Sequence, residues 1–439
     1  MTYQETCEYL FNAMPMFERQ GASGYKEGLS NSLALDEHFG HPHKKFLSIH
    51  VAGTNGKGSC SHTLSAILQM CGYRVGLYTS PHLVDFSERI RINGQPIPED
   101  YVVNFVDQER SFIESLQPSF FEVTTAMAFK FFAEMNVDIA VIEVGLGGRL
   151  DCTNIITPIL SIITNIGMDH TQFLGSTLQE IALEKAGIIK PGVPVLIGES
   201  TPETREIFDA VAKEAHSSII YAEDNDKKEV LYSQPSGRGF TYQTEHFGIL
   251  YGEQAGIYQT KNTNTILCAV TQLERLGFMH PFACDPEAEC QNKEVKEGFK
   301  NVSKLTGLKG RWQTVKEDPK TVCDTGHNLP GWEYLSKQLS TVKCRHMHIL
   351  FGLVDDKDVE GIMKLLPKDA TYYFTKASSK RAVSETILNL YAQQLGLEGK
   401  CYPNVVSAYD DIKKDATEKD FVFIGGSSYV VADFLKNCI

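Results

Sequence analysis

The sequence predicts an α/β protein in two unequal parts. The N-terminal part has a mostly parallel sheet behind a phosphate-binding loop and carries a small antiparallel annex, and the smaller C-terminal part is a Rossmann-like α/β domain. Two observations predict this class. Short apolar runs alternate with helical patterns, and a glycine-rich loop, "HVAGTNGKGSC", directly follows the first of these runs. A chain of 439 residues is long enough for two or three domains with separate cores.

Strands and helices are expected to alternate in the first part. Buried strands are predicted at 45–51, 74–79, 137–144, 159–166 and 193–198, and helices at 59–71, 124–135 and 176–189. Thr177 and Glu180 have the spacing of a capping box at the start of the third helix. Such an alternation is typical of parallel strands with helices on both faces of the sheet.

Residues 218–260 have a different pattern, and the chain then returns to alternation. Three short aromatic and β-branched segments, "SIIYAE", "GFTYQT" and "FGILYG", are predicted to form the antiparallel annex. A helix is expected at 262–277, and a polar, charged stretch at 284–298 leads to a predicted boundary between parts 1–302 and 303–439. In the second part, strands are predicted at 320–324, 347–352, 371–375 and 421–426.

Composition excludes several classes of protein. The chain is 42% hydrophobic and 22% charged, and no apolar run approaches the length of a membrane span, so no membrane association is expected. A formal net charge of −13 disfavours nucleic acid as a partner. The N-terminus has no signal-peptide pattern, and the eleven cysteines contain no CxxC pair, which indicates reduced thiols in the cytoplasm.

The glycine loop has the composition of a phosphate site. Glycines allow backbone N–H groups to approach a phosphate, the following helix adds its dipole, and Lys57 supplies a positive charge. The spacing is unusual, since Gly58 separates Lys57 from Ser59. An ordinary glycine turn is the alternative.

Polar residues follow two of the predicted strands. Glu143 ends the strand at 137–144, and Asp169 and His170 follow the next strand, so they are expected at the carboxyl edge of the sheet, where ligands bind. A carboxylate there suits Mg²⁺. The alternatives are a solvated or capping glutamate and a structural histidine. Lys185, on the next helix, would by itself be interpreted as a solvated lysine.

The second half contributes fewer signals. Arg311 lies in "GLKGRW", and "CDTGHN" places Asp324, His327 and Asn328 after a strand; all of these are also compatible with an ordinary surface. Asn262 stands at the start of the helix predicted at 262–277 and could be only its cap.

These motifs together resemble the folylpolyglutamate synthase/dihydrofolate synthase family, a branch of the Mur-ligase-like ATP-dependent amide-forming enzymes. "HVAGTNGKGS", "TSPHL", "ERIRING", "EVGLGGRLDCTN", "GMDHTQFLG", "EKAGIIKPGVP", "DTGHN" and "IGGSSYVV" occur in the family's order over nearly the whole chain. The glycine between the lysine and the serine belongs to this family's loop. Two motifs depart from the family: Thr325-Gly326 replaces Gly-Ala before His327, and "GSSY" replaces "GSLY".

The resemblance implies an ATP-binding central domain and a C-terminal domain that contacts nucleotide and glutamate. The implied ATP-binding residues are Gly53, Thr54, Asn55, Gly56, Lys57, Gly58, Ser59, Asn262, Arg311 and Asp324. Those implied for two Mg²⁺ sites are Ser59, Glu143, His170 and a carbamylated Lys185. Those implied for the pterin are Ser80, Pro81, His82 and Phe121, and for glutamate His327 and Ser427. The implied catalytic residues are Lys57, His170, Lys185, Arg311 and His327.

Two of these assignments also have a physical rationale. A bare Lys185 ammonium beside two divalent cations would be repelled, whereas a carbamate supplies negative oxygens. Phe121 belongs to an aromatic run that could stack on a pterin or could equally be core packing.

The resemblance implies an ATP-dependent ligase that joins glutamate to dihydropteroate, to reduced folate (poly)glutamates, or to both, through an acyl phosphate. We expect one monomeric cytoplasmic chain to carry both activities. The alternatives are a monofunctional folylpolyglutamate synthase, another Mur-type amide ligase, and a phosphate-loop switch that binds nucleotide without chemistry.

Overall fold

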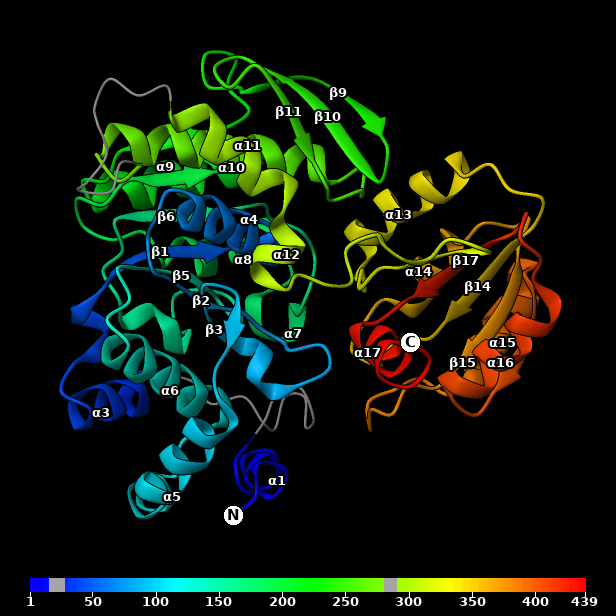
Figure 1. The fold of residues 1–439 in the computed structure, drawn as a ribbon, viewed down its shortest axis with the longest axis horizontal. Helices are drawn as coiled ribbons and strands as arrows, with labels where there is room; N and C mark the ends of the chain where they lie inside the picture. Colours follow the sequence, from blue (N-terminus) through cyan, green and yellow to red (C-terminus); the bar gives the residue numbers. More distant parts are fainter. Residues whose placement is uncertain (16–27, 280–289) are drawn as a thin grey trace.

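The described chain, residues 1–15, 28–279 and 290–439 of a computed structural model, folds around two large sheets and a small one. In Figure 1 the larger N-terminal body, blue to lime, lies beside a smaller C-terminal body, yellow to red. None of the described helices is both long and apolar enough to cross a membrane.

The larger sheet has eight strands in the order β4-β3-β2-β5-β1-β6-β7-β8. Their bounds are β1 Leu47–Ala52, β2 Val75–Tyr78, β3 Ile90–Ile92, β4 Gln95–Pro96, β5 Ile139–Glu143, β6 Leu160–Ile163, β7 Val195–Ile197 and β8 Ile219–Tyr221. Only β3 and β4, at one edge, pair antiparallel. The mostly parallel sheet predicted from the alternation is therefore confirmed.

Helices cover both faces of this sheet, because alternate residues of each strand point to opposite sides. In β5, Val141 packs in one core and its neighbours Ala140 and Ile142 in another. The first face carries α4 Lys57–Met70, α10 Gln259–Arg275 and α11 Cys290–Lys300; the second carries α1 Tyr3–Ala13, α5 Glu99–Leu116, α6 Phe120–Glu134, α8 Leu178–Ala186 and α9 Pro202–Glu214.

Short helical elements complete this part, and the predicted capping box is present. The remaining elements are α3 Ser30–His38, η2 Pro42–Lys45, η3 Phe86–Arg89, η4 Cys152–Ile155, α7 Thr171–Leu174 and α12 Val302–Thr306. Thr177 and Glu180 form the box at the start of α8. Most of the charged stretch predicted at 284–298 forms α11, and its first six residues lie outside the described chain.

The annex is smaller than the sequence predicted. It contains β9 Val230–Ser236, β10 Gly239–Thr244 and β11 Ile249–Gly252, all antiparallel. The segment "SIIYAE" was predicted to belong to it, but this assignment is wrong: β8 pairs parallel with β7 at the edge of the large sheet. A short β-branched segment suits either edge equally well, so long-range packing decides its partner.

The C-terminal sheet has six strands in the order β12-β13-β17-β14-β15-β16, of which only β12 is antiparallel. The strands are β12 Gln313–Lys316, β13 Lys320–Cys323, β14 Met347–Phe351, β15 Thr371–Thr375, β16 Glu398–Tyr402 and β17 Phe421–Gly425. One face carries α13 Leu329–Thr341, α14 Val359–Lys364 and α15 Glu385–Leu395, and the other carries α16 Val405–Asp415 and α17 Ser428–Asn437. The four predicted strands are confirmed, whereas the edge strands β12 and β16 were not predicted.

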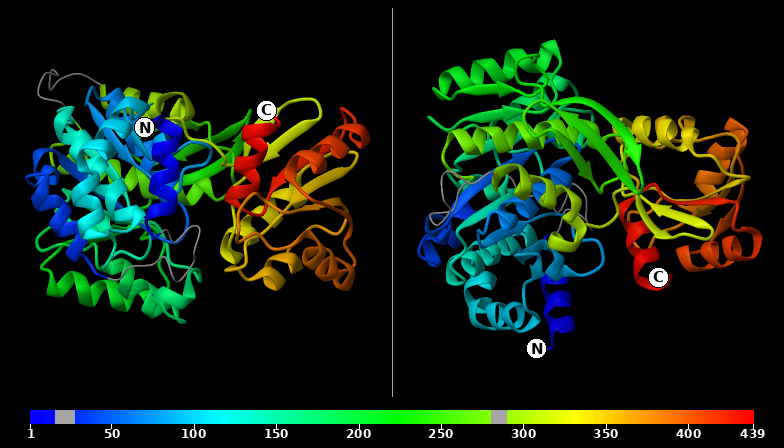
Figure 2. Two further views of the ribbon diagram at one scale, coloured as in Figure 1. Left: turned by 90° about the horizontal axis from the view of Figure 1, so that it is seen from below. Right: turned by 45° about the horizontal axis from the view of Figure 1, so that its top comes forward.

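Contacts join the two bodies at several points. The annex reaches toward the C-terminal body in Figure 2. Arg238, in the turn between β9 and β10, forms an ion pair with Glu317, in the turn between β12 and β13. On α13, the Gln338 side chain donates to the Ala255 carbonyl (2.8 Å) and accepts from the Ile257 N–H (2.8 Å). The predicted boundary between residues 302 and 303 falls within α12, which packs on α4, and stays a prediction.

Candidate functional site

The glycine loop between β1 and α4 depends on two glycines with left-handed backbone. Gly53 has φ +146° and Gly56, the N-cap of α4, has φ +84°. A Cβ at Gly53 would lie 1.9 Å from the Thr164 hydroxyl oxygen, and one at Gly56 would lie 2.4 Å from the Asn262 side-chain oxygen. The loop therefore packs against the ends of β6 and α10 only because these residues lack side chains.

Gly58, the extra glycine, allows two charged side chains to approach the first turn of α4. A Cβ at this position would lie 3.3 Å from Arg311 Nη2 and 3.8 and 3.9 Å from the carboxylate oxygens of Glu143. Arg311, although it adjoins the C-terminal sheet, is thus already close to the loop helix. This contact gives the unusual spacing of the loop a structural reason.

Two lysines share one carbonyl oxygen. Lys57 Nζ donates to Gly53 O at 2.9 Å and to Thr54 O at 3.2 Å, and Lys185 Nζ donates to the same Gly53 O at 3.1 Å. Lys185 is 4% exposed, so it is not the solvated lysine that its sequence context allowed. Burial, followed by the charge of Lys57, lowers the pKa of Lys185 to about 7. Desolvation also lowers the pKa of Lys57. Two such cations on one side of a cavity favour an anion there.

Glu143 is buried at the end of β5. Burial raises its pKa to about 7, and the charges of Lys57 and Arg311 act in the opposite direction. Its carboxylate accepts from the Ser80 N–H at 3.4 Å.

Gln259 links Ser59 of the loop helix to Asn262. Ser59 Oγ accepts from Gln259 Nε2 at 3.1 Å, and Asn262 Nδ2 donates to Gln259 Oε1 at 2.8 Å. Asn262 lies buried within α10 and is therefore not its cap.

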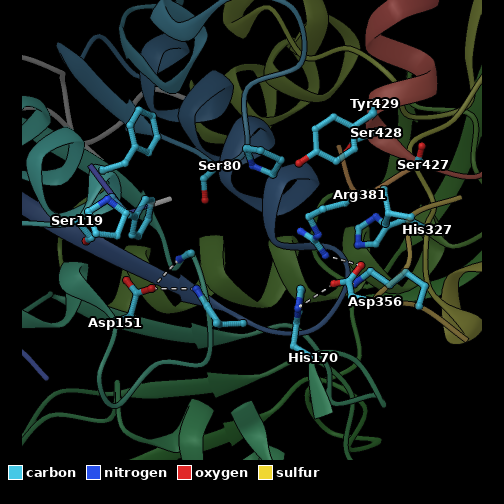
Figure 3. A pocket seen from close by; sticks show the side chains of 18 of the residues that line it. Ser80, Ser119, Asp151, His170, His327, Asp356, Arg381, Ser427, Ser428 and Tyr429 are labelled. Atoms are coloured by element: carbon cyan, nitrogen blue, oxygen red, sulfur yellow. Dashed lines mark hydrogen bonds and ion pairs between the residues drawn. The ribbon is translucent and has the colours of Figure 1, made fainter. Parts of the chain in front are cut away.

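A network of charges surrounds His170 (Figure 3). Its Nδ1 lies 3.8 Å from Asp356, which pairs with Arg381 at 2.6 Å. Asp169 pairs with Lys357 at 2.6 Å across the two bodies. Burial raises the pKa of Asp169, but the hydrogen bond and charges of the neighbouring histidines and lysine outweigh it, so the pKa lies well below its usual range. Asp169 is therefore a stable anion that ties the bodies together.

Asp324 shapes the loop that carries Arg311. The carboxylate accepts from the Tyr258 hydroxyl (2.6 Å), the Trp312 N–H (2.8 Å) and the Gly326 N–H (2.8 Å), while burial raises its pKa. Arg311 Nη1 donates to the Thr325 hydroxyl and to the Gly310 carbonyl (3.2 Å). Asp324 is thus buried and fully engaged.

His327 and Ser427 lie at the other side of the site. His327 Nδ1 is 3.0 Å from the Thr325 carbonyl, and its Nε2 is 3.7 Å from Asp169. The Ser427 hydroxyl accepts from the Val430 N–H at 3.2 Å and so caps α17. Both residues face the pocket drawn in Figure 3.

Three cavities meet at Ser80, Pro81 and His327, which line all of them. The first, of about 460 Å³, is lined by all predicted ATP and metal residues, namely Gly53, Thr54, Asn55, Gly56, Lys57, Gly58, Ser59, Asn262, Arg311, Asp324, Glu143, His170 and Lys185. The second, of about 190 Å³, is lined by Phe121 and Ser427, and the third, of about 110 Å³, by His82. The predicted residues thus gather around one junction, and some of them line more than one cavity; His170, for example, lines the first and the second.

The second cavity has aromatic and polar walls. Phe121 is half-buried and stacks on Tyr78 with ring centroids 5.8 Å apart, so one side of its ring is covered by protein. Asp151 accepts from the backbone N–H groups of Gly145 and Leu146 at 3.0 and 2.9 Å, which fixes the glycine turn after Glu143. His82 stacks on Phe11 at 5.9 Å, outside this cavity.

The sequence pointed to Asn55 and Asn328 as candidate site residues, but it did not predict that they join the two bodies at the loop. Asn55 and Asn328 exchange side-chain hydrogen bonds of 3.1 and 3.0 Å, and Asn328 also donates to Asp169 at 2.9 Å. Asn328 follows His327 in "DTGHN", which was the available signal, but its partner lies 273 residues away. Lys357 lies in "FGLVDDKD", a segment that also carries the resemblance, but its pairing with Asp169, 188 residues away, was not predicted.

The described residues contain no group of three or more His, Cys, Asp or Glu that could hold a metal ion by itself. Any metal at Glu143 must therefore take other ligands, such as Ser59, His170 or the oxygens of a bound phosphate.

Comparisons with known proteins agree with this geometry. The Mur ligase middle domain matches residues 51–270, and the Mur ligase glutamate ligase domain matches residues 310–428. A dihydrofolate synthase/folylpolyglutamate synthase of Bacillus subtilis is 32% identical over 94% of this chain and 95% of its own length. The structure of E. coli FolC in complex with DHPP and ADP has a TM-score of 0.81 at 29% identity and covers 99% of this chain and 97% of that one. Mycobacterium tuberculosis folylpolyglutamate synthase complexed with ADP has a TM-score of 0.85 at 29% identity, with the same coverage.

Proposed function

The chain belongs to the dihydrofolate synthase/folylpolyglutamate synthase family of Mur ligases, and from this premise we propose that it is an ATP-dependent ligase that joins glutamate to a pterin-containing carboxylic acid. The observation that carries the proposal is the junction of three cavities beside the phosphate loop, with Lys57 on one side and Arg311 on the other. A switch that only binds nucleotide has no use for the two further cavities.

The chemistry begins at the acceptor carboxylate, whose oxygen is a poor leaving group. One carboxylate oxygen attacks the γ-phosphorus of ATP, the bond to the bridging oxygen breaks, and ADP departs, which leaves an acyl phosphate. The amine of glutamate then attacks the carbonyl carbon, phosphate leaves, a proton is lost, and an amide remains. Lys57, the loop N–H groups and Arg311 neutralise negative charge on the transferred phosphoryl group.

The residues around Glu143 fit Mg²⁺. Magnesium in nucleotide sites is usually held by one or two carboxylates together with substrate phosphates, so a dedicated cage is not required. Glu143 supplies a buried carboxylate, Ser59 a hydroxyl and His170 an imidazole on the same cavity. When bound, Mg²⁺ neutralises phosphate charge. A nearby cation also favours the ionised form of the Glu143 carboxylate, whose pKa burial raises.

We also propose that Lys185 is carbamylated and takes part in a second Mg²⁺ site. As an ammonium it shares the Gly53 carbonyl with Lys57, so two buried cations lie together. A carbamate would replace this repulsion with negative oxygens that a divalent cation can bind.

The second cavity is the proposed pterin site. Phe121 offers a ring face already supported by Tyr78, and Ser80 and Pro81 connect this cavity to the reacting centre. His82 lines the adjoining third cavity. We assign glutamate to the side where His327 and Ser427 lie.

We propose that one chain carries both activities, because both reactions use ATP, a carboxylate on a pterin-containing acceptor and the amine of glutamate. The test supplies MgATP and glutamate with dihydropteroate in one assay and with tetrahydrofolate in another. Glutamate-dependent ADP formation is expected in both. Product formation with tetrahydrofolate alone would indicate a monofunctional folylpolyglutamate synthase. If neither acceptor gave product, the remaining alternatives would be another Mur-type ligase or a nucleotide-binding switch. The monomeric state, cytoplasmic location and absence of a nucleic-acid partner stay predictions.

A further inference from the structure

The third cavity contains charged side chains, among them Arg91, Glu88 and Lys309, that have no role in the proposed ATP, pterin and glutamate sites. It lies between the loop that follows β2, strand β3 and the segment from α12 to β12, and its volume is about 110 Å³. Pockets that bind a whole drug-sized ligand usually measure about 300 to 1,000 Å³. This cavity is therefore suited to a group that branches from a substrate bound elsewhere.

The cavity is lined by a buried arginine with few partners. Arg91, on β3, is 6% exposed, and its Nη1 donates only a long hydrogen bond of 3.3 Å to the Gly94 carbonyl. Its Nε has no hydrogen-bond partner in the described chain. A Cβ at Gly307 would lie 2.9 Å from Nη1, so the guanidinium packs closely beneath the end of α12. Burial lowers the pKa of Arg91, and the charge of Glu88 offsets this only in part, so a further anion in the cavity would stabilise the guanidinium.

The other charged side chains that line the third cavity do not remove its preference for an anion. Glu88 accepts from the Leu83 and Val84 N–H groups at 2.8 and 3.2 Å, and its second oxygen lies 3.8 Å from Lys309. Glu88 is thus engaged by two backbone N–H groups and by Lys309, and Lys309, which is 47% exposed, lines the same cavity as Arg91 and adds a second cation to it. Arg311 and Glu143 form the wall shared with the ATP cavity.

His62 adds a hydrogen-bond acceptor to the same wall. The Thr306 hydroxyl donates to the Val302 carbonyl at 2.7 Å, so its oxygen is left to accept from His62 Nδ1 at 2.8 Å. Burial lowers the pKa of His62 to about 3, so the ring is neutral and its Nε2 is an acceptor. The cavity thus offers cations for a carboxylate and an acceptor for an amide N–H.

We propose that the third cavity binds the γ-glutamyl tail of an acceptor that already carries glutamate, with Arg91 and Lys309 on its α-carboxylate. This inference rests on the proposed function. Ser80 and Pro81 line both the proposed pterin cavity and the ATP cavity, so an acceptor that spans the two cavities lies near them, where the third cavity also opens. Incoming glutamate is assigned to His327 and Ser427, so the acceptor's tail is the anion that remains.

The test measures KM and kcat of Arg91→Met, Lys309→Gln and the control Lys304→Gln with acceptors that carry no, one or three glutamates. Lys304 is an exposed lysine on the same α12 segment that does not line the cavity. For Arg91→Met, the KM for the triglutamate acceptor is expected to rise about tenfold or more, since charge-assisted hydrogen bonds are lost. The KM for dihydropteroate should rise far less, and the KM for glutamate should stay constant. For Lys309→Gln, the KM for the triglutamate acceptor is expected to rise only about threefold, because Lys309 is exposed. The KM for dihydropteroate should again rise less than that.

Several results would overturn the proposal. A raised KM for glutamate with every acceptor would place the incoming amino acid here, and a uniform loss of kcat with a lowered melting temperature in both variants would indicate a structural role. If Arg91→Met fails to fold, the test rests on Lys309→Gln. An unchanged KM of Lys309→Gln for the triglutamate acceptor would then overturn the proposal. A wild-type protein that uses dihydropteroate only would also overturn it and leave the ligase intact, whereas no turnover with any acceptor would overturn the proposed function itself.

Discussion

Single residues decide the charge around the phosphate loop. Lys57, Lys185 and Arg311 are three of the cations that line one cavity, and Glu143 is one of the carboxylates that line it. Lys57 and Lys185 hydrogen-bond to the same loop carbonyl, so two cations lie close together beside the phosphate loop. A bound polyphosphate would place further negative charge beside them.

Lys57→Ala is expected to abolish turnover while the fold remains intact. The lysine opposes phosphate charge that grows in the transition state, and loss of one such contact typically costs about 10²- to 10³-fold in rate. Steady-state ADP release and a thermal melt of the same preparation check this. Near-normal turnover with an unchanged melting temperature would show that the loop does not hold the transferred phosphate.

Lys185 is expected to be carbamylated in the active protein. Lys185→Ala should therefore lose activity, and short carboxylic acids should restore part of it, since they can supply the missing oxygens. A high-resolution density map of the metal-loaded, active protein checks the modification directly. A plain ammonium in that map would contradict the prediction.

Gly58→Ala is expected to reduce turnover without lowering the melting temperature. Alanine is favoured over glycine within a helix by about 1 kcal/mol, so α4 itself should not suffer. The added methyl group would lie 3.3 Å from Arg311 Nη2 and displace it from the loop. Gln69→Ala, near the other end of α4, is the control. Full activity of Gly58→Ala would show that this close approach is dispensable.

At the scale of elements, the start of α13 connects the two bodies. Asn328 caps this helix by accepting from the Gly331 N–H at 2.9 Å, and the same side chain exchanges hydrogen bonds with Asn55 in the phosphate loop. The cap of a C-terminal helix is thereby linked to the loop that is expected to hold ATP. A change at Asn328 should therefore reach the nucleotide without touching it.

Asn328→Asp is expected to raise the KM for ATP about five- to tenfold and to preserve α13. An aspartate still caps the helix, but it cannot donate to Asn55, and it places a second carboxylate against Asp169. Asn404→Asp is the matched control, since Asn404 caps α16 through a similar 2.9 Å bond on an exposed surface. Equal ATP dependence in both variants would show that the link has no functional role.

At the scale of the whole molecule, the ATP cavity of about 460 Å³ has walls from both bodies. The phosphate side is already in contact, since Arg311 adjoins Gly58 and Asn328 bonds Asn55. Acceptor and glutamate are assigned to the cavities that open beside the ATP cavity at Ser80, Pro81 and His327. We expect the two bodies to approach further once the ligands are bound, because closure of this kind excludes water from a reactive acyl phosphate.

Small-angle scattering is expected to show compaction when an ATP analogue and a pteroate are added together. The same ligands should compact Lys57→Ala much less, because that variant binds the triphosphate poorly. An unchanged radius of gyration in the wild-type protein at saturating ligand would contradict domain closure.

The sequence by itself determined the alternation of strands and helices, the phosphate loop and the family. These features depend on local periodicity and on short motifs, such as the two left-handed glycines that the loop requires. The tertiary structure alone decided that β8 joins the large sheet, that Lys185 is buried beside Lys57, and that Asn328 bonds Asn55. Lys185 and its hydrogen-bond partner Gly53 lie 132 residues apart along the chain, and Asn328 and Asn55 lie 273 residues apart. Residue type and spacing set what a side chain can bind, but only the packing of the two bodies sets which partner it meets.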